Sequence, residues 1–378
     1  MSTTGTAEDT RAIRVGRLAS ALVGRELDAL IVDSLVDIGY LTGFTGSHAM
    51  VLVVADQARA KLGPHRFFSD FRYETQSAEQ VLEVFAREIV SGDLLDAVAH
   101  ALDGHRGRLG FNDASVSVKA HDHLRELLGE AWELVPAGGA VEGLRAVKDA
   151  GEIARIRAAS ELADEALRLV LEDGLVGRSE REVAIELELR MRRLGAQAPS
   201  FPSIVASGDH AALPHAEPRD HPIVRDVLVT IDWGALHEGY CSDCTRTYAT
   251  GEGISTQARE VYELVLSAEE QGLAAVAAGR NGREVDAVAR EVIEQAGHGE
   301  HFGHGLGHGV GMEVHEGPRL SRTAGDQPLQ AGNVVTVEPG VYLPGVLGVR
   351  IEDLVVVGED EGSQEVLTSL PKALTVVS

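Results

Sequence analysis

Acidic residues recur at matched positions in two segments of the chain that resemble β-hairpins. In residues 227–250, two strand-like runs surround a turn, and a two-residue turn at His237 and Glu238 would place Asp232 directly opposite Asp243. Facing residues on adjacent strands have Cβ atoms about 5 Å apart. Two carboxylates that close repel each other unless a proton or a cation lies between them. Apolar residues before Asp232 favour a buried strand and a bound cation, although a surface hairpin with two exposed acids remains the alternative.

The second acidic pair lies in residues 334–356. Glu338 and Glu352 stand seven residues on either side of Gly345, which follows Pro344 at the expected turn. These two glutamates are therefore also predicted to face each other. Each hairpin would deliver one pair of carboxylates to a common site.

A segment rich in glycine and histidine, residues 301–311, lies between the two hairpins and is followed by His315. Its glycines allow close approach of the backbone, and its histidines supply imidazole nitrogens. A phosphate-binding glycine loop is disfavoured because the segment follows a helix rather than a strand. A histidine-rich surface loop remains the other alternative.

Four carboxylates and one imidazole form an oxygen-rich ligand set. Such a set suits Mn²⁺ or Co²⁺ better than a single tetrahedral structural zinc ion. Two divalent ions about 3.5–4 Å apart can share a water and lower its pKa, which gives a hydroxide nucleophile at neutral pH. The residues therefore predict a two-metal hydrolase.

Two helix starts in the second part of the chain carry the same capping signal. After a predicted helix over residues 152–171, Ser179 is followed three residues later by Glu182, and Asn281 is followed by Glu284. The two starts are 102 residues apart. They indicate either an internal duplication or a coincidence between two ordinary helix starts. A duplication would place a shared site between two similar halves.

The first part of the chain reads as a separate α/β domain. Residues 30–32 and 50–54 are predicted buried strands, and strands alternate with helical stretches to about residue 135. Pro and Gly within residues 135–140 mark a linker. We expect a domain over residues 1–141 and a second over residues 142–378.

Composition narrows the possible partners and the compartment. The 378 residues carry 59 acidic against 34 basic side chains, a formal net charge of -25, which argues against nucleic acid or an anionic membrane as partner. No secretory signal and no membrane-spanning segment is recognisable. Two cysteines imply no disulfide framework. The protein is expected to be cytoplasmic.

Cys241 and Cys244 surround Asp243 in a C-x-x-C pattern that is typical of redox or zinc sites. No second cysteine pair is present to complete a zinc site. Residues three apart on a strand point to opposite faces, so the two thiols cannot easily meet. We therefore interpret both cysteines as packing residues.

Taken together, these motifs resemble the "pita-bread" metallopeptidases of the creatinase/aminopeptidase P type, which include Xaa-Pro dipeptidase (prolidase), aminopeptidase P and methionine aminopeptidase. The resemblance covers the whole chain and is carried by IDWG at residues 231–234, GYCSDCTRT at 239–247, GHGLGHG at 303–309, VEPGVY at 337–342 and VRIED at 349–353. It implies a mixed α/β (α+β) fold. A small creatinase/prolidase-type N-terminal domain would precede a pseudo-twofold pita-bread catalytic domain.

The resemblance also implies how the ligands share two divalent metal ions. Asp232 would chelate one ion, and Asp243 and Glu352 would bridge the two. His308 and Glu338 would complete the coordination of the second ion. Mn²⁺ is the expected metal, with Co²⁺ or Zn²⁺ as alternatives.

Further residues match catalytic and substrate-binding positions of the family. Glu338 would act as the acid/base that moves the proton of the nucleophilic water. His215 matches a histidine that contacts substrate or stabilises the intermediate. His304 and His315 match histidines that bind substrate and polarise the scissile carbonyl. Arg350 matches an arginine that supports the site beside the last glutamate.

Two regions bear on which family member this is. Residues 40–47 and 68–73 resemble the N-terminal domain of creatinase and prolidase, which methionine aminopeptidases lack. All five ligands are present, which argues against a metal-free or catalytically inactive peptide-binding relative.

Arg319 matches an arginine that receives the C-terminal carboxylate of a dipeptide in some prolidases, although a surface arginine beside an acidic site is the alternative. The expected function is thus Xaa-Pro dipeptidase, acting on proline-containing peptides as a homodimer. Aminopeptidase P, which accepts longer Xaa-Pro peptides, is the alternative. Hydrolysis of an organophosphate ester in the same site is a further one.

Overall fold

The computed structural model describes residues 4–378. The chain divides into two compact units, Met1–Arg145 and Ala146–Ser378. The predicted division near residue 141 lies at the start of helix α7 (Glu142–Ala146). We refer to the two parts as the N-terminal and the C-terminal unit.

The N-terminal unit is built on one six-stranded sheet with the strand order β4-β3-β2-β1-β5-β6. The predicted strands at residues 30–32 and 50–54 are confirmed as β1 and β2, which pair antiparallel. The strands are β1 (Ala29–Val32), β2 (Ala49–Val54), β3 (His65–Asp70), β4 (Phe85–Val90), β5 (Gly107–Phe111) and β6 (Trp132–Pro136). The helices are α1 (Thr4–Gly24), α2 (Leu35–Thr42), α3 (Arg59–Leu62), α4 (Glu74–Gln80), α5 (Leu94–Ala101), α6 (Val118–Leu128) and α7.

Residues 40–47 begin in a helix and continue as an irregular loop. Tyr40, Leu41 and Thr42 form the last turn of α2, which begins after the N-cap Ser34. The helix ends at Gly43, whose φ of 83° is a left-handed conformation that glycine adopts without steric cost. The irregular stretch therefore begins only at Gly43.

The C-terminal unit contains two similar pairs of helices. The first pair is α8 (Ala150–Glu172) and α9 (Glu180–Leu194), and the second is α10 (Thr256–Ala274) and α11 (Gly282–Gln295). Both predicted capping boxes are confirmed, with Ser179 and Glu182 starting α9 and Asn281 and Glu284 starting α11. Each half thus repeats a long helix, a shorter capped helix and a set of strands, as a duplication predicts.

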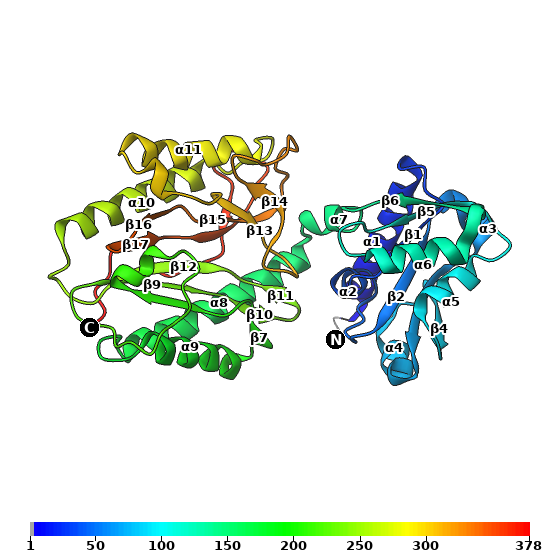
Figure 1. The fold of residues 1–378 in the computed structure, drawn as a ribbon, viewed down its shortest axis with the longest axis horizontal. Coiled ribbons are helices and arrows are strands. Elements are labelled where there is room, and N and C mark those ends of the chain that lie inside the picture. Colours follow the sequence, from blue (N-terminus) through cyan, green and yellow to red (C-terminus); the bar gives the residue numbers. More distant parts are fainter. Residues whose placement is uncertain (1–3) are drawn as a thin grey trace. The chain divides into compact units, whose positions relative to one another are not determined.

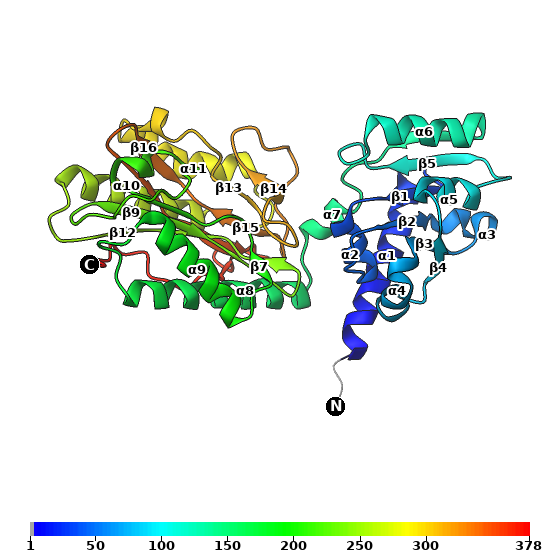
Figure 2. The same ribbon diagram turned by 60° about the horizontal axis from the view of Figure 1, so that its bottom comes forward.

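The strands of this unit lie between the two helix pairs, with α10 and α11 on one side and α8 and α9 on the other (Figures 1 and 2). Each side has its own apolar core. The strands of the first half are β7 (Ala198–Pro199), β8 (Ile204–Ser207), β9 (Leu228–Trp233), β10 (Ala235–His237), β11 (Tyr240–Cys241) and β12 (Cys244–Ala249). Those of the second half are β13 (Gly307–Gly309), β14 (Glu316–Leu320), β15 (Val334–Val337), β16 (Gly340–Leu343), β17 (Leu347–Arg350), β18 (Asp353–Val356) and β19 (Glu365–Val366).

The first acidic hairpin forms in a register different from the predicted one. His237 pairs with Tyr240, so the two-residue turn is Glu238-Gly239, with φ values of 47° and 79°. Two consecutive residues with positive φ match the twist of a hairpin, and glycine is favoured at the second of them. Asp232 consequently faces Thr245, and Asp243 lies diagonally from it, two positions along the strand. The prediction that the two aspartates face each other directly is wrong.

The second acidic hairpin has the predicted register. Gly340 pairs with Arg350 in β16 and β17, and Val337 pairs with Asp353 in β15 and β18. Glu338 and Glu352 lie between these pairs in the same register, so they face each other. Gly345 is in the loop between β16 and β17, with a φ of 71°.

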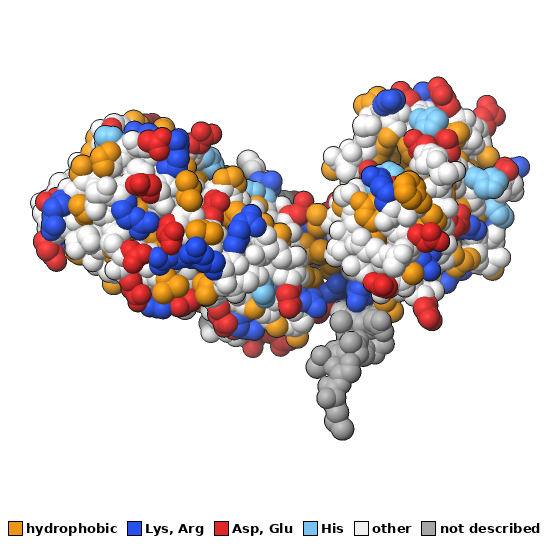
Figure 3. Space-filling model, turned by 90° about the horizontal axis from the view of Figure 1, so that it is seen from below, with side chains coloured by type: hydrophobic (Ala, Val, Ile, Leu, Met, Phe, Trp, Pro, Cys, Tyr) orange, Lys and Arg blue, Asp and Glu red, His pale blue; other side chains and the backbone are white. Residues whose placement is uncertain are grey.

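Both cysteines are buried thiols, in agreement with their interpretation as packing residues. Cys244 belongs to the core beside α8 and α9, whereas Cys241 packs in a different apolar cluster. On the face shown in Figure 3, acidic and basic side chains of the C-terminal unit are interspersed rather than gathered by sign. Within residues 4–378, no helix combines the length and the apolar character that crossing a membrane requires.

Candidate metal centre

Three carboxylates carried by strands of the C-terminal unit, or by the residues that join two strands, lie close together. Asp232 lies on β9, Asp243 between β11 and β12, and Glu352 between β17 and β18. Each offers one oxygen, and the three oxygens lie within 4.8 Å of one another. Asp243 and Glu352 are only 5% and 2% exposed. The diagonal register of the first hairpin therefore still brings its two aspartates to one site.

Two oxygens of this cluster are buried and lack a hydrogen-bond partner among the described residues: Oδ1 of Asp232 and Oε1 of Glu352. The other oxygen of each carboxylate is occupied, since Arg350 Nη2 lies 2.7 Å from Asp232 Oδ2 and Thr245 Oγ1 donates to Glu352 Oε2 at 2.7 Å. A buried carboxylate oxygen without a partner is costly unless a cation binds it. The residues present thus fit a divalent metal site.

His308 and Glu338 adjoin this cluster. His308 Nε2 lies 3.3 Å from Glu338 Oε1 and 3.6 Å from Asp243 Oδ2. Its other nitrogen, Nδ1, is 3.1 Å from the carbonyl oxygen of Gly309, which can only accept a hydrogen bond. The proton of the neutral ring therefore sits on Nδ1, which leaves Nε2 as a potential metal ligand facing the acids.

The electrostatics reflect four acids held close together. Burial, and then the charges of neighbouring acids, raise the pKa of Asp243 and of Glu352 well above the usual range. Burial also raises the pKa of Asp232, although Arg350 opposes this effect. Burial would raise the pKa of Glu338 too, but His308 in its protonated form donates a hydrogen bond and adds a positive charge, which lower that pKa to about 2. The cluster therefore repels itself, and a divalent cation would relieve that repulsion.

A cavity of about 660 Å³ opens onto these acids. His215, His304 and His315 all line it. The ring of His315 packs edge-on against that of His308, with centroids 4.4 Å apart. Nε2 of His304 lies 2.9 Å from the hydroxyl of Tyr342. All three predicted histidines are thus brought to the same cavity as the acids.

Arg350 is buried behind the acids, and each of its three nitrogens donates to a protein acceptor. Besides the contact with Asp232, Nε donates to Thr245 Oγ1 at 2.9 Å and Nη1 to the Tyr342 hydroxyl at 2.8 Å. This arrangement places the arginine as a support of the carboxylates. Thr245 and Tyr342 were not assigned a role from the sequence, because nothing in their local pattern signals these contacts.

Arg319 lies on β14 directly opposite His308 of β13. Its side chain is exposed and lines the cavity, and among the described residues it makes no hydrogen bond or ion pair. Apolar Phe201, Pro202 and Ile204 form another part of the wall. The cavity therefore combines an apolar wall, the carboxylates of the acidic cluster and the guanidinium of Arg319, which is available to bind a ligand.

Comparisons with known proteins match both units. The model of "Metallopeptidase family M24" matches residues 154–359, and that of the "Creatinase/Prolidase N-terminal domain" matches residues 14–147. An uncharacterized peptidase of Bacillus subtilis, YqhT, is 40% identical over 93% of this chain and 96% of its own length.

Two solved structures resemble the chain over nearly its whole length. The Xaa-Pro dipeptidase from Bacillus anthracis superposes with a TM-score of 0.89 at 37% identity, over 97% of this chain and 99% of that protein. The X-Pro aminopeptidase from Thermotoga maritima superposes with a TM-score of 0.84 at 35% identity, over 95% and 99%.

Proposed function

Because the chain belongs to metallopeptidase family M24, we propose that this metallo-exopeptidase is an Xaa-Pro dipeptidase with two divalent metal ions. The observation that carries the metal site is a pair of buried oxygens in a cluster of four acids, Asp232 Oδ1 and Glu352 Oε1, which have no hydrogen-bond partner among the described residues. Cleavage next to proline is supported by relatives named for that activity.

In this proposal, Asp232 would hold one ion, His308 and Glu338 would hold the second, and Asp243 and Glu352 would serve both. Bound divalent ions supply Lewis acidity, which polarises a peptide carbonyl and lowers the pKa of a water. Glu338 is suited to moving a proton because its Oε1 accepts a hydrogen bond from Thr336 and lies 3.3 Å from His308 Nε2. Four carboxylates match the charge of two divalent ions.

The three cavity histidines take the roles of substrate ligands in this proposal. His215 and His315 face the cavity beside the acids and would contact the peptide near the scissile bond. His304 lies between the Gly305 carbonyl and the Tyr342 hydroxyl, which fix its ring orientation. Arg350 acts indirectly, by holding Asp232.

Arg319 supports the dipeptidase over the aminopeptidase. A dipeptide ends in a carboxylate directly after the proline, close to the scissile bond. Arg319 stands opposite His308 and has no acidic partner among the described side chains of residues 10–378, so its guanidinium can receive that carboxylate in a bidentate contact. A longer peptide lacks a charge at this position and would gain nothing from Arg319.

Hydrolysis of Ala-Pro and Ala-Pro-Ala by Mn²⁺-loaded enzyme tests the substrate. We expect Ala-Pro to be preferred, and Arg319→Ala to remove this preference. Arg322→Ala is the matched control, because Arg322 is an exposed arginine paired with Glu294 and does not line the cavity. Faster cleavage of the tripeptide by the unaltered enzyme would make it an aminopeptidase P, an activity supported by the similarity to the Thermotoga maritima structure.

Metal analysis of the purified protein tests the site. We expect two divalent ions per chain, with Mn²⁺ giving the highest activity, and no turnover in Asp243→Ala or Glu352→Ala. A fully active Glu352→Ala variant would refute the ligand assignment. Absence of bound metal would instead favour a catalytically inactive, peptide-binding protein. We also propose a cytoplasmic homodimer, for which analytical ultracentrifugation is the direct measurement of assembly.

A further inference from the structure

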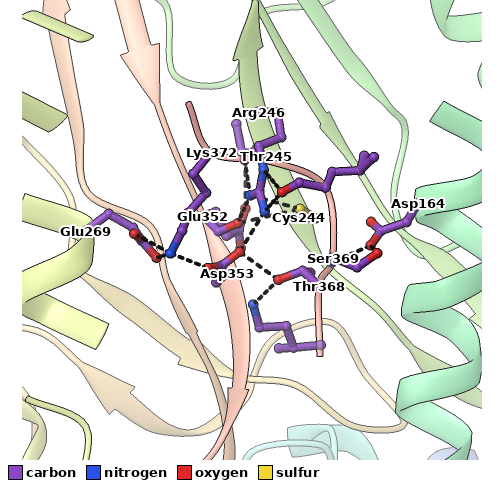
Figure 4. A network of polar contacts seen from close by, with 12 residues as sticks. Asp164, Cys244, Thr245, Arg246, Glu269, Glu352, Asp353, Thr368, Ser369 and Lys372 are labelled. Atoms are coloured by element: carbon purple, nitrogen blue, oxygen red, sulfur yellow. Dashed lines mark hydrogen bonds and ion pairs between the residues drawn. The ribbon is translucent and has the colours of Figure 1, made fainter. Parts of the chain in front are cut away.

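A buried network of charged groups lies directly behind the metal centre and is centred on Asp353, the residue after Glu352 (Figure 4). Oδ1 of Asp353 accepts hydrogen bonds from Arg246 Nη2 and from Thr368 Oγ1, both at 2.7 Å. Its Oδ2 lies 2.7 Å from Lys372 Nζ. Both oxygens of this carboxylate are therefore held by other groups.

Lys372 stands between two buried carboxylates. Its Nζ is 2.7 Å from Asp353 and 2.8 Å from Oε2 of Glu269 on α10, as Figure 4 shows. The side chains of Asp353 and Glu269 are 2% and 0% exposed. Buried carboxylates require a compensating positive charge, and removal of one partner leaves the other charge uncompensated. Lys372 supplies that charge to Asp353, whose pKa is lowered by Arg246 and Lys372, and to Glu269 once it ionises.

The segment that carries Lys372, residues 368–372, is tied to elements of both halves of the unit. Ser369 donates to Asp164 of α8 through its N–H at 2.6 Å and its hydroxyl at 2.8 Å. The carbonyl of Leu370 accepts from Arg246 on β12, and that of Lys372 accepts from Tyr262 on α10 at 2.8 Å. The segment is thus fixed at several points around Asp353.

The position of Asp353 determines that of Glu352. The carbonyl of Glu352 accepts a hydrogen bond from Arg246, which also holds Asp353, and its N–H donates to the Thr245 carbonyl at 3.1 Å. Successive residues of an extended chain point to opposite faces. Anchoring Asp353 on the far face therefore holds the Glu352 carboxylate toward Asp232 and Asp243.

We propose that residues 368–372, and Lys372 in particular, position Glu352 for metal binding. Lys372 is thus a positioning residue, because it does not contact the metal site itself. This inference rests on the two-metal site proposed above. The C-terminal segment would then set the metal affinity, while substrate contacts remain with the cavity residues. Substitution of residues that hold metal ligands in place commonly lowers metal affinity by about 10–100-fold.

The test is Mn²⁺ binding to metal-free full-length protein, measured by calorimetry for the unaltered chain and Lys372→Met. We expect affinity to fall by about tenfold or more, with the KM for Ala-Pro unchanged at saturating Mn²⁺. Thr368→Val removes one hydrogen bond of Asp353 while retaining Lys372, and should weaken binding by a smaller factor. This variant decides the question if Lys372→Met does not fold.

Val377→Ala is the matched control. Val377 is a buried residue five positions after Lys372, packed in the core beside α8 and α9 and outside the charged network. It should lower the Tm without weakening Mn²⁺ binding. The inference is overturned if folded Lys372→Met and Thr368→Val bind Mn²⁺ as the unaltered chain does, or if Val377→Ala loses as much affinity for the same loss in Tm. If the unaltered chain itself binds no Mn²⁺, the proposed function fails instead.

Discussion

Thr245 offers the sharpest test of how the metal centre is held together. Its side chain is completely buried, and its hydroxyl donates to Glu352 Oε2 at 2.7 Å while accepting from Arg350 Nε at 2.9 Å. One hydroxyl thus joins a carboxylate and the arginine behind it. Thr245→Val replaces this hydroxyl by a methyl group of similar volume and leaves both partners in place.

The magnitude follows from the two lost contacts. A hydrogen bond to a charged group contributes about 1.5–3 kcal/mol, and a neutral one about 1 kcal/mol. Because Arg350 is charged in all conditions, we expect Thr245→Val to lower the unfolding free energy of the C-terminal unit by about 3 kcal/mol. Thr245→Ser keeps the hydroxyl and loses one buried methyl group, which costs only about 1 kcal/mol.

Differential scanning calorimetry of the metal-free protein measures both variants against the unaltered chain. The valine variant should show the larger loss, and it should also bind Mn²⁺ more weakly, because Glu352 loses the donor that orients it. If Thr245→Val costs no more than Thr245→Ser and binds Mn²⁺ equally well, the hydroxyl does not hold the site together.

Three further outcomes follow from the charges of the C-terminal unit. Mn²⁺ affinity should fall as the pH is lowered, because burial and neighbouring acids raise the pKa of Asp243 and Glu352 and protons then compete with the metal. Binding that calorimetry finds to be independent of pH would contradict this. Burial raises the pKa of Glu269 to about 8, above that of a glutamate in the unfolded chain. Protonation of Glu269 therefore stabilises the folded state at low pH, and this contribution is lost as the pH rises through about 8. The Tm should decline over that range, and less so in Glu269→Gln. Glu217 is an exposed acid that lines the cavity. Because Glu217→Lys would repel a lysine side chain of the substrate, it should lower the rate of Lys-Pro hydrolysis relative to that of norleucine-Pro by about two- to fivefold. An unchanged ratio of the two rates would show that Glu217 does not face the substrate.

The parts of the structure that local patterns specify could be predicted. The capping boxes at Ser179 and Asn281 are short-range signals, and both helices begin where expected. The hairpin around Gly345 has a single Pro-Gly turn, so its register was unambiguous. In the first hairpin, the Glu238-Gly239 turn carries glycine where a positive φ is required, a signal that favours it over a turn one residue earlier.

The supporting contacts could not be predicted, because each joins residues far apart in the chain. Lys372 reaches Glu269 across 103 residues, and Arg350 reaches Asp232 across 118. Nothing in the residues next to Lys372 indicates that its side chain lies between two buried acids. Such contacts depend on which elements the fold brings together, and periodicity and turn chemistry do not encode that.

The same long-range contacts explain why the metal centre sits where the two halves meet. Asp243 belongs to the first half and Glu352 to the second, and the backbone of Glu352 is bonded to Thr245 of the first half. Arg350, from the second hairpin, compensates Asp232 of the first. Each half thus supplies one acid, Asp232 or Glu352, that a side chain of the other half holds. Metal ions held by both Asp243 and Glu352 would therefore link the two halves, and metal binding would then stabilise the C-terminal unit.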